Sequence, residues 1–294
     1  MSECAIEARG LTKRFGRNVA VDGLELAIPY GRVYGFLGRN GAGKTTTIKM
    51  LLGLLSPTCG NISVLGLDPR KQAKAIKLQV GYVAENQRMY GWMKVKEILK
   101  FTAGFYSTWD KELVQESIER FELDPEAKVK SLSQGQRMRL ALVLALAHNP
   151  RLLILDDPTM GLDPISRKEF LNDIISSLRE GGRTIFFSTH LLAEIERVAD
   201  SVAIIDRGKL KVAGEIDFLK STTKGIRLTF ADSPPKQISV EGLLRVQTNG
   251  RDCVITVKDF SETKVDVLRL QYDPVHHEVI DLSLDDIFSE FVLS

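Results

Sequence analysis

The feature that most constrains this chain is a glycine-rich run that fits the phosphate-binding pattern G-x-x-x-x-G-K-[ST] at every fixed position. A mostly apolar run at 32–37 precedes it and predicts a buried strand. Residues 46–55 follow with apolar side chains on one face and predict a helix. A chance glycine-rich turn is the weaker alternative, because both flanks suit the loop. The run consists of Gly38, Arg39, Asn40, Gly41, Ala42, Gly43, Lys44 and Thr45.

Such a loop brings several phosphate-binding groups together. Its glycines let successive backbone N–H groups point inward, and the following helix adds the positive end of its dipole. Lys44 supplies a positive charge to the outer phosphates, and the Thr45 hydroxyl is placed to ligate Mg²⁺. The sequence therefore predicts a protein that binds a nucleoside triphosphate.

Composition places the chain among ordinary globular proteins and argues against nucleic acid as a partner. Its 294 residues suffice for about two domains, and 44% of them are hydrophobic and 27% charged. The net charge of +2 is far from the basic balance of a nucleic-acid-binding domain. Residues 221–294 are acidic, with 8 Lys and Arg against 12 Asp and Glu. This change in charge predicts a domain boundary near residue 220.

Cysteine usage and the apolar runs bear on where the protein works. Cys4, Cys59 and Cys253 lie far apart and form neither a disulfide framework nor a metal-ligand spacing, which favours the reducing cytoplasm. The N-terminal residues lack the basic region and apolar core of a secretion signal. The longest apolar stretch, 140–147, is far shorter than the roughly 20 residues that span a bilayer. If the protein serves a membrane, another chain must supply the spans.

The region before the helical part of the chain predicts short strands at 3–9, 24–28, 61–65 and 80–83. A turn is expected at 13–16, with one exposed aromatic, Phe15. An aromatic there could stack on a purine, which is worth about 0.5–1.5 kcal/mol, or it could be a packing residue. A polar loop that contains Glu85 follows the last of these strands.

Two helices are expected next, and their aromatic residues are expected to form a helical core. The first covers 95–106 and the second 110–121, with Asp110 as its N-cap. Residues 132–136, Leu-Ser-Gln-Gly-Gln, then open a helix that runs through His148. A Ser and a Gly at a helix N-terminus make a second anion site, or only a plain helix cap.

Two buried strands carry polar residues at their carboxyl ends. Residues 151–157 form an apolar run that ends in Asp156 and Asp157, as expected of a central parallel strand. Open α/β sheets bind ligands at that end, where one carboxylate can hold Mg²⁺ and a neighbour can orient or deprotonate a water. Asp163 lies on the following loop, and His190 comes just after the strand predicted at 184–188.

The last part of the chain predicts a small α+β region. Runs at 226–230, 243–248 and 253–257 are of β type, and a capping-box-like start at 283–286 predicts a final helix. His276 and His277 are expected in a solvated turn rather than at a metal site.

Taken together and in this order, these motifs resemble the ATP-binding cassette ATPases of ABC transporters over about residues 3–220. The 132–136 element is the specific one, because other phosphate-loop families lack it. The chain is most similar to ATPase subunits of the ABC-2 type exporter branch, which often carry a C-terminal extension. The resemblance implies an α/β phosphate-loop NTPase core at 1–220 with an antiparallel N-terminal β part and a helical insert at about 86–148. The small α+β extension at 221–294 has no assigned role.

The resemblance also implies a mechanism and partners. Two cassettes would sandwich two ATP molecules. Each ATP would be bound by residues Gly38 to Thr46 of one chain and capped by the other chain. Membrane permease subunits would hold the cassettes at the cytoplasmic face of the membrane, and the loop at 85–92 would press on them. The residues that would cap the partner's ATP are Ser133, Gly135 and Gln136.

The remaining assignments carry over position by position. Phe15 would stack on adenine, and Asp156 would hold Mg²⁺ together with Thr45. His190 would touch the γ-phosphate, and Asp163 would cross the seam between the two cassettes. The catalytic residues implied are Asp157, His190 and Glu85, and Glu85 would also ligate Mg²⁺.

Three positions depart from the family's usual residues. Family members usually have Gln at Glu85, Gly at Gln134 and Glu at Asp157. Asp157 is one methylene shorter, about 1.5 Å of reach, and a misplacement of about 1 Å can reduce a rate on the order of a hundredfold. The first hypothesis is a slow transport-coupled ATPase; the second is an ATP-gated dimerisation switch with little hydrolysis. A soluble cassette ATPase that is not tied to transport is the third.

Overall fold

The structure, a computed structural model, describes residues 3–179 and 182–293. The chain divides into two compact units, one that ends at Leu210 and one that begins at Lys211. The domain boundary near residue 220 and the functions assigned to the two parts stay predictions.

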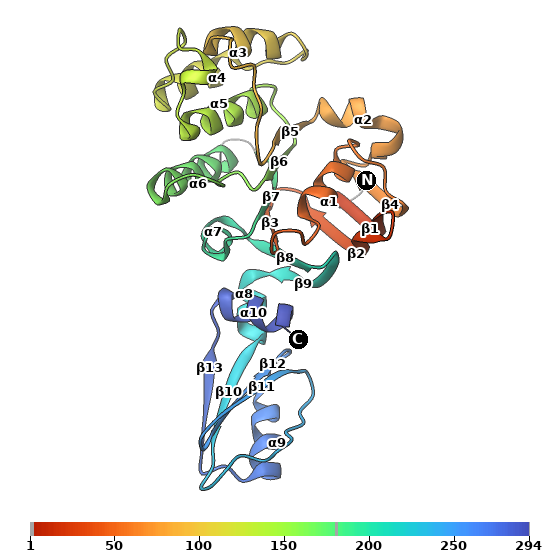
Figure 1. Cartoon of the computed structure of the whole chain (residues 1–294), viewed down its shortest axis with the longest axis vertical. Coiled ribbons are helices and arrows are strands. Elements are labelled where there is room, and N and C mark those ends of the chain that lie inside the picture. The colour runs from red at the N-terminus through yellow and green to blue at the C-terminus, as the bar shows by residue number, and fades with distance from the viewer. Residues whose placement is uncertain (1–2, 180–181, 294) are drawn as a thin grey trace. The chain divides into compact units, whose positions relative to one another are not determined.

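Five parallel strands form the centre of the first unit (Figure 1), and β9, within which the second unit begins, is the sixth strand of their sheet. Its strand order is β5-β6-β7-β3-β8-β9, and the first five strands in this order pair in parallel. Strands β6, β7 and β3 are buried along their whole length and mostly apolar, as expected of parallel strands covered on both faces. The strands are β3 (Val33–Leu37), β5 (Val80–Val83), β6 (Leu152–Asp156), β7 (Thr184–Thr189), β8 (Ser201–Asp206) and β9 (Lys209–Glu215).

A three-stranded antiparallel sheet, with the order β2-β1-β4, forms the N-terminal β part. The expectation of short first strands and of a turn at 13–16 was wrong. Strand β1 continues through Phe15, which pairs with Asn18, and the turn occupies residues 16–17. Residues 13–15 are extended rather than in a turn because they pair with residues 18–21 of β2 in the antiparallel ladder. The strands are β1 (Cys4–Phe15), β2 (Asn18–Pro29) and β4 (Cys59–Val64).

Helices α3, α4 and α5 lie together and share a core that contains Ile98, Phe121 and Leu140 (Figure 1). The expected aromatic core is only partly correct. Phe121 is buried, but Phe101 and Phe105 are 43% and 65% exposed. Phe101 is not on the face of α3 that buries Ile98 and Leu99, and Phe105 lies beyond the end of the helix at Ala103. The helices of this unit are α1 (Lys44–Leu51), α2 (Pro69–Lys77), α3 (Val95–Ala103), α4 (Lys111–Arg120), α5 (Gln134–Leu146), α6 (Pro164–Arg179) and α7 (Leu192–Val198), with a 3₁₀ turn at Val129–Ser131.

The second unit is an antiparallel sheet, with the order β11-β12-β10-β13, and three helices. Val265 and Leu268 of α9 pack in a core with Ile226 and Ile255 of the sheet. Ser283 and Asp286 form the expected reciprocal cap of α10. The elements are α8 (Ile216–Thr222), β10 (Lys224–Thr229), β11 (Leu243–Asn249), β12 (Asp252–Val257), α9 (Glu262–Tyr272), β13 (His276–Asp281) and α10 (Leu284–Leu293).

The expected turn at His276 and His277 is wrong, because both residues belong to β13. They pair with Thr229 and Leu228 of β10 in an antiparallel ladder. The turn expectation failed because these residues gain their partners from a strand almost fifty positions earlier. The arrangement of both units confirms the predicted fold class, an α/β core with an antiparallel N-terminal part and an α+β extension.

Candidate active site

Strand order brings the sequence motifs to one edge of the central sheet. Strands β5, β6, β7 and β3 are neighbours in that order, and they run parallel, so their carboxyl ends meet. The phosphate loop follows β3 and Glu85 follows β5. Asp156 ends β6, and His190 follows β7. Four motifs that are far apart in the sequence therefore lie at one sheet edge, where α/β folds bind ligands.

The phosphate loop is shaped by close backbone contacts. Gly43, the N-cap of α1, has a φ of 108°, and a Cβ on it would lie 2.5 Å from the carbonyl oxygen of Ala20. Glycine alone suits this position. No side chain of the described residues caps α1, so the first amide groups of the helix are open to an anion, which the helix dipole also favours.

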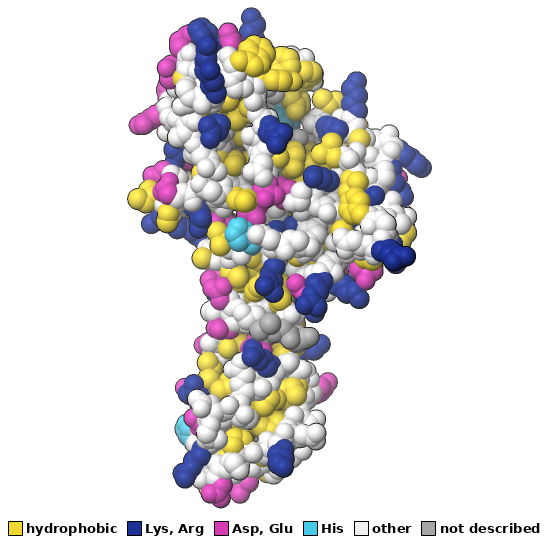
Figure 2. Space-filling model, viewed as in Figure 1, with side chains coloured by type: hydrophobic (Ala, Val, Ile, Leu, Met, Phe, Trp, Pro, Cys, Tyr) yellow, Lys and Arg dark blue, Asp and Glu magenta, His cyan; other side chains and the backbone are white. Residues whose placement is uncertain are grey.

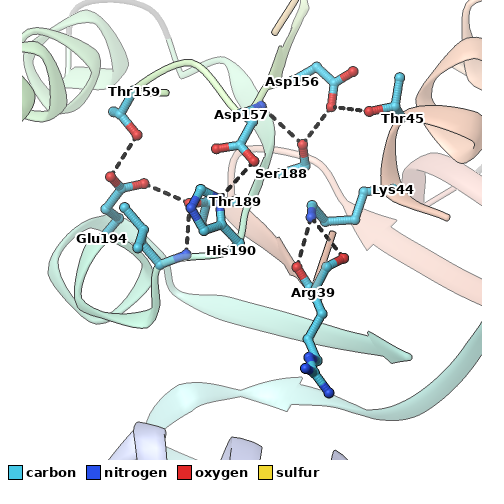
Figure 3. A network of polar contacts seen from close by, with 12 residues as sticks. Arg39, Lys44, Thr45, Asp156, Asp157, Thr159, Ser188, Thr189, His190 and Glu194 are labelled. Carbon is cyan, nitrogen blue, oxygen red and sulfur yellow. Dashed lines mark hydrogen bonds and ion pairs between the residues drawn. The ribbon is translucent and has the colours of Figure 1, made fainter. Parts of the chain in front are cut away.

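Lys44 lies beneath this loop and is only 7% exposed. Its Nζ donates to the carbonyl oxygens of Gly38, at 2.7 Å, and Arg39, at 3.4 Å (Figure 3). Burial lowers the pKa of the Lys44 ammonium, while the carboxylates of Asp157 and Asp156 act in the opposite direction. A bound anion would stabilise the charged form further, so the ammonium is placed to bind phosphate.

A cavity of about 420 Å³ opens over the loop. Asn40–Thr46 line it together with Glu85 and Asp157. Sequence reasoning missed part of the lining, which comes from Asn18, Val19 and Ala20 of β2 and from Arg207. These residues carry no phosphate-binding pattern of their own, and the fold brings them to the loop.

Asp156 is buried between the loop and β7. Thr45 Oγ1 and Ser188 Oγ both donate to its Oδ1, at 3.2 and 2.7 Å (Figure 3). Its Oδ2 is buried and accepts no hydrogen bond within the part of the chain that the structure describes. Burial raises the pKa of this carboxyl, with the two hydrogen bonds opposing the rise. A cation would relieve the cost of the buried charge.

The groups around Asp156 fit Mg²⁺. A carboxylate and a hydroxyl are hard oxygen ligands, and Mg²⁺ is usually held by one or two such groups, with substrate phosphates and waters completing its shell. Residues 3–179 and 182–293 contain no cluster of three or more His, Cys, Asp or Glu that could hold a metal by itself. Thr45 and Asp156 supply two oxygen ligands of the kind that Mg²⁺ takes together with substrate phosphates.

Asp157 has a backbone conformation that L-residues rarely adopt, with a φ of 45°. Its N–H donates to Ser188 Oγ at 3.1 Å, and its Oδ2 lies 2.9 Å from Nδ1 of His190. Its Oδ1 is buried and accepts no hydrogen bond from any residue described. The short side chain thus reaches His190 and keeps one oxygen for another donor.

The remaining predicted residues do not line the loop cavity. Ser133 caps α5 reciprocally with Gln136, so the plain helix cap is present (Ser133 Oγ to Gln136 N, 3.1 Å). Asp163 accepts from the backbone of Ile165 and the hydroxyl of Ser166 at the start of α6. The other two are Gly135 and Phe15, which is 50% exposed and has the Lys13 ammonium 5.1 Å from the centre of its ring.

Ser188 is a residue that sequence reasoning overlooked. It donates to Asp156 and accepts from the Asp157 backbone, and it is fully buried. The signal available was the pair of hydroxyl residues, Ser188 and Thr189, at the end of an otherwise apolar strand. Their partners could not be known before the strand order.

We expect Ser188→Ala to lower both stability and ATP turnover. The buried Asp156 carboxylate would lose a charge-assisted hydrogen bond, which is worth about 1.5–3 kcal/mol, and turnover should fall about tenfold as Asp156 and Asp157 shift. Thr184→Val on the same strand is the control, because the Thr184 hydroxyl accepts from the Gly31 amide at 3.0 Å and contacts neither Asp156 nor Asp157 among the hydrogen bonds of the described residues. Urea unfolding and steady-state turnover measure the two effects. Equal turnover in the two variants would contradict the role of Ser188.

Known proteins resemble this chain in sequence and in structure. Residues 21–160 match the family described as ABC transporter. The bacitracin transport ATP-binding protein BcrA of Bacillus licheniformis is 36% identical, over 98% of this chain and 97% of its own. The daunorubicin resistance ATP-binding protein DrrA3 of Streptomyces coeruleorubidus is 33% identical, over 98% and 96%. A solved ATP-binding subunit of an ABC transporter superposes with a TM-score of 0.66 at 27% identity, over 72% of this chain and 90% of that one.

The chain belongs to the ATP-binding proteins of ABC transporters, which confirms the family resemblance of its motifs. It is an ATPase of this family and an ATP-binding subunit of a transporter. Within the residues that the structure describes, no helix has the length and apolar character needed to cross a membrane.

Proposed function

We propose that the chain hydrolyses ATP to drive an exporter of the ABC-2 type, as one of two cassettes that close around two ATP molecules. The observation that carries the proposal is the connected polar network at one sheet edge. It runs from Thr45 through Asp156 and Ser188 to Asp157 and His190 (Figure 3). The relatives named for bacitracin transport and daunorubicin resistance support the exporter branch.

In this proposal, the phosphates of ATP lie over Gly38–Thr46. The Lys44 ammonium and the backbone amides hold the β- and γ-phosphates, in the manner of phosphate loops in general. Thr45 and Asp156 would hold Mg²⁺, with Glu85 at the cavity wall as a further oxygen ligand. When bound, Mg²⁺ supplies positive charge that offsets the charge on the phosphate oxygens.

Asp157 accepts the proton of the attacking water through Oδ1. That oxygen is buried and accepts no hydrogen bond from the residues that the structure describes, whereas Oδ2 contacts His190 Nδ1. His190 therefore sets the orientation of the Asp157 carboxylate, and its side chain is 34% exposed, so it can also contact the γ-phosphate. A general base placed in this way typically contributes a factor of about 10²–10⁴ to a rate.

A second cassette would complete the site. Ser133, Gly135 and Gln136 do not line the cavity over their own phosphate loop, which supports a role at the ATP of a partner. Phe15 is 50% exposed at the end of β1, where its ring would stack on adenine. Asp163 would lie at the seam between the two chains.

The membrane subunits would contact an aromatic surface beside the helical part. Tyr90, Trp92, Phe101 and Phe105 are exposed and in ring contact, and Figure 2 shows hydrophobic side chains gathered over α3. A groove of about 360 Å³ adjoins them and includes residues of the loop after β5. If that loop moves when the γ-phosphate binds or leaves, its movement would be transmitted to the permease subunits. The chain would thus be peripheral on the cytoplasmic face of the membrane.

Gel filtration with Mg²⁺ and ATP tests the two-cassette site. Asp157→Asn, which should bind ATP without hydrolysing it, is expected to elute at twice the 32.8 kDa of one chain. Adding Ser133→Arg should return it to the monomer position, because the arginine would block the partner's nucleotide. Ser131→Arg, on the exposed residue two positions earlier, is the control. A dimer that survives Ser133→Arg would contradict the proposal.

Co-purification from native membranes tests the link to transport. A chain with several membrane spans should accompany the protein when it is isolated under mild conditions. Alanine at Trp92 and Phe105, which are exposed, should weaken that association. Recovery of the protein without any membrane chain would favour a soluble ATPase.

A further inference from the structure

Glu194 on α7 is a buried carboxyl group. It does not line the phosphate-loop cavity, and it is not among the proposed metal ligands. It is 3% exposed, yet both of its oxygens are used. Thr159 Oγ1 donates to Oε1 at 2.6 Å, and Thr189 Oγ1 donates to Oε2 at 2.8 Å (Figure 3). The Arg167 guanidinium forms an ion pair with Oε1 at 3.3 Å. A buried carboxyl group with these partners connects three segments.

Two of the three segments carry the proposed reacting groups Asp157 and His190, and the third is the start of α6. Thr159 lies two residues after Asp157 on the loop that follows β6. Thr189 comes directly before His190 and also accepts from the Leu191 amide at 3.1 Å. Arg167 lies in the first turn of α6, where its N–H donates to the carbonyl oxygen of Asp163 at 2.9 Å.

The contact between Asp157 and His190 depends on both loops at once. It joins two side chains from different strand ends across 2.9 Å. Asp157 also has the left-handed φ of 45°, a conformation that persists only where surrounding contacts hold it. Thr159 and Thr189 are both fully buried, so their hydroxyls have no water as an alternative partner. Glu194 is the group that satisfies both.

We propose that Glu194 is a positioning residue for ATP hydrolysis, which keeps the Asp157 loop and the His190 loop at the separation that their contact requires. The ion pair with Arg167 extends this tie to the start of α6 and to Asp163. The inference rests on the roles proposed above for Asp157 and His190. A displacement of about 1 Å at reacting groups can cost about a hundredfold in rate. Loss of the Glu194 contacts should therefore lower ATP turnover more than it lowers ATP affinity.

The test compares Glu194→Ala and Glu194→Gln with Glu196→Ala, an exposed position on the same helix. We expect Glu194→Ala to lower kcat at least tenfold, with the Kd for a fluorescent ATP analogue within twofold of the unaltered protein. Glu194→Gln should recover kcat to within about threefold. The glutamine carbonyl oxygen can accept a hydrogen bond from one threonine hydroxyl, and the NH₂ group can donate to the oxygen of the other threonine, because that hydroxyl can rotate its hydrogen away. Glu196→Ala should match the unaltered chain.

A second readout does not depend on turnover. The chain has four histidines, so isotope labelling of the imidazole rings gives a simple NMR spectrum. Glu194→Ala should shift the ring resonances of His190 and leave those of His276 and His277, in the second unit, unchanged. Glu194→Gln should leave all four close to their original positions. If Glu194→Ala does not fold, Thr189→Val removes one hydroxyl at constant size and should show the same His190 shift.

Several results would overturn the inference. Turnover of Glu194→Ala within twofold of normal would do so, as would an unmoved His190 resonance. A parallel loss of kcat, ATP affinity and melting temperature, with no recovery in Glu194→Gln, would indicate a merely structural residue. Failure of the proposed function gives a different result. Asp157→Asn would then leave turnover unchanged, while Glu194→Ala would still shift the His190 resonance.

Discussion

Replacement of Lys44 by alanine is expected to reduce ATP affinity and turnover by at least a hundredfold. The ammonium is buried under the phosphate loop, where Gly38 and Arg39 hold it through their carbonyl oxygens. With ATP bound, the ammonium and the phosphates would form a buried charge pair, and removing one partner of such a pair costs about 3–5 kcal/mol. Each 1.4 kcal/mol is a factor of about ten in affinity. Equilibrium binding of an ATP analogue and steady-state turnover both measure the loss.

Lys49→Ala is the matched control for this variant. Lys49 lies on the same helix, α1, and its side chain is exposed. Its removal changes the net charge equally and should leave ATP affinity within about twofold, because exposed charges contribute little. ATP affinity that falls equally in both variants would show that net charge, rather than the buried ammonium, binds the phosphates.

Asp157→Asn is expected to reduce turnover by about 10²–10⁴-fold while leaving ATP binding nearly unchanged. The amide keeps the size of the side chain and can still contact His190, but it cannot accept a proton from water. Lys44 keeps its contact with Gly38, and Thr45 keeps its contact with Asp156, so the nucleotide should still bind. Single-turnover hydrolysis and equilibrium binding separate the two effects. Unchanged turnover would exclude Asp157 as the base.

Asp157→Glu asks whether the shorter side chain limits the rate. Asp157 already reaches His190 at 2.9 Å, and it is 4% exposed, so an added methylene must find room inside the site. Faster hydrolysis by Asp157→Glu would show that the aspartate is too short for the attacking water. If the unaltered chain had no turnover and the longer side chain restored it, the ATP-gated switch would replace the ATPase. Equal rates would make the difference in reach unimportant.

Much of the fold and site could be predicted from short stretches of sequence. The phosphate loop, the apolar strand before Asp156 and the capping residues Ser133 and Ser283 depend on contacts within a few positions. Such local patterns are visible in a single sequence. The burial of Phe101 was predicted incorrectly, since the end of α3 and its packing decide which side of an aromatic helix meets solvent.

The sequence by itself determined the chemical groups of the site and the strand or loop that carries each one. Tertiary structure decided which of these groups meet. The strand order β5-β6-β7-β3 differs from the order of the strands along the chain, and it places Ser188 between Asp156 and Asp157. It also gives Glu194 its two threonines, which are 35 and 5 positions away. Hydrogen bonds of this kind depend on distances in space, which periodicity along the chain does not encode.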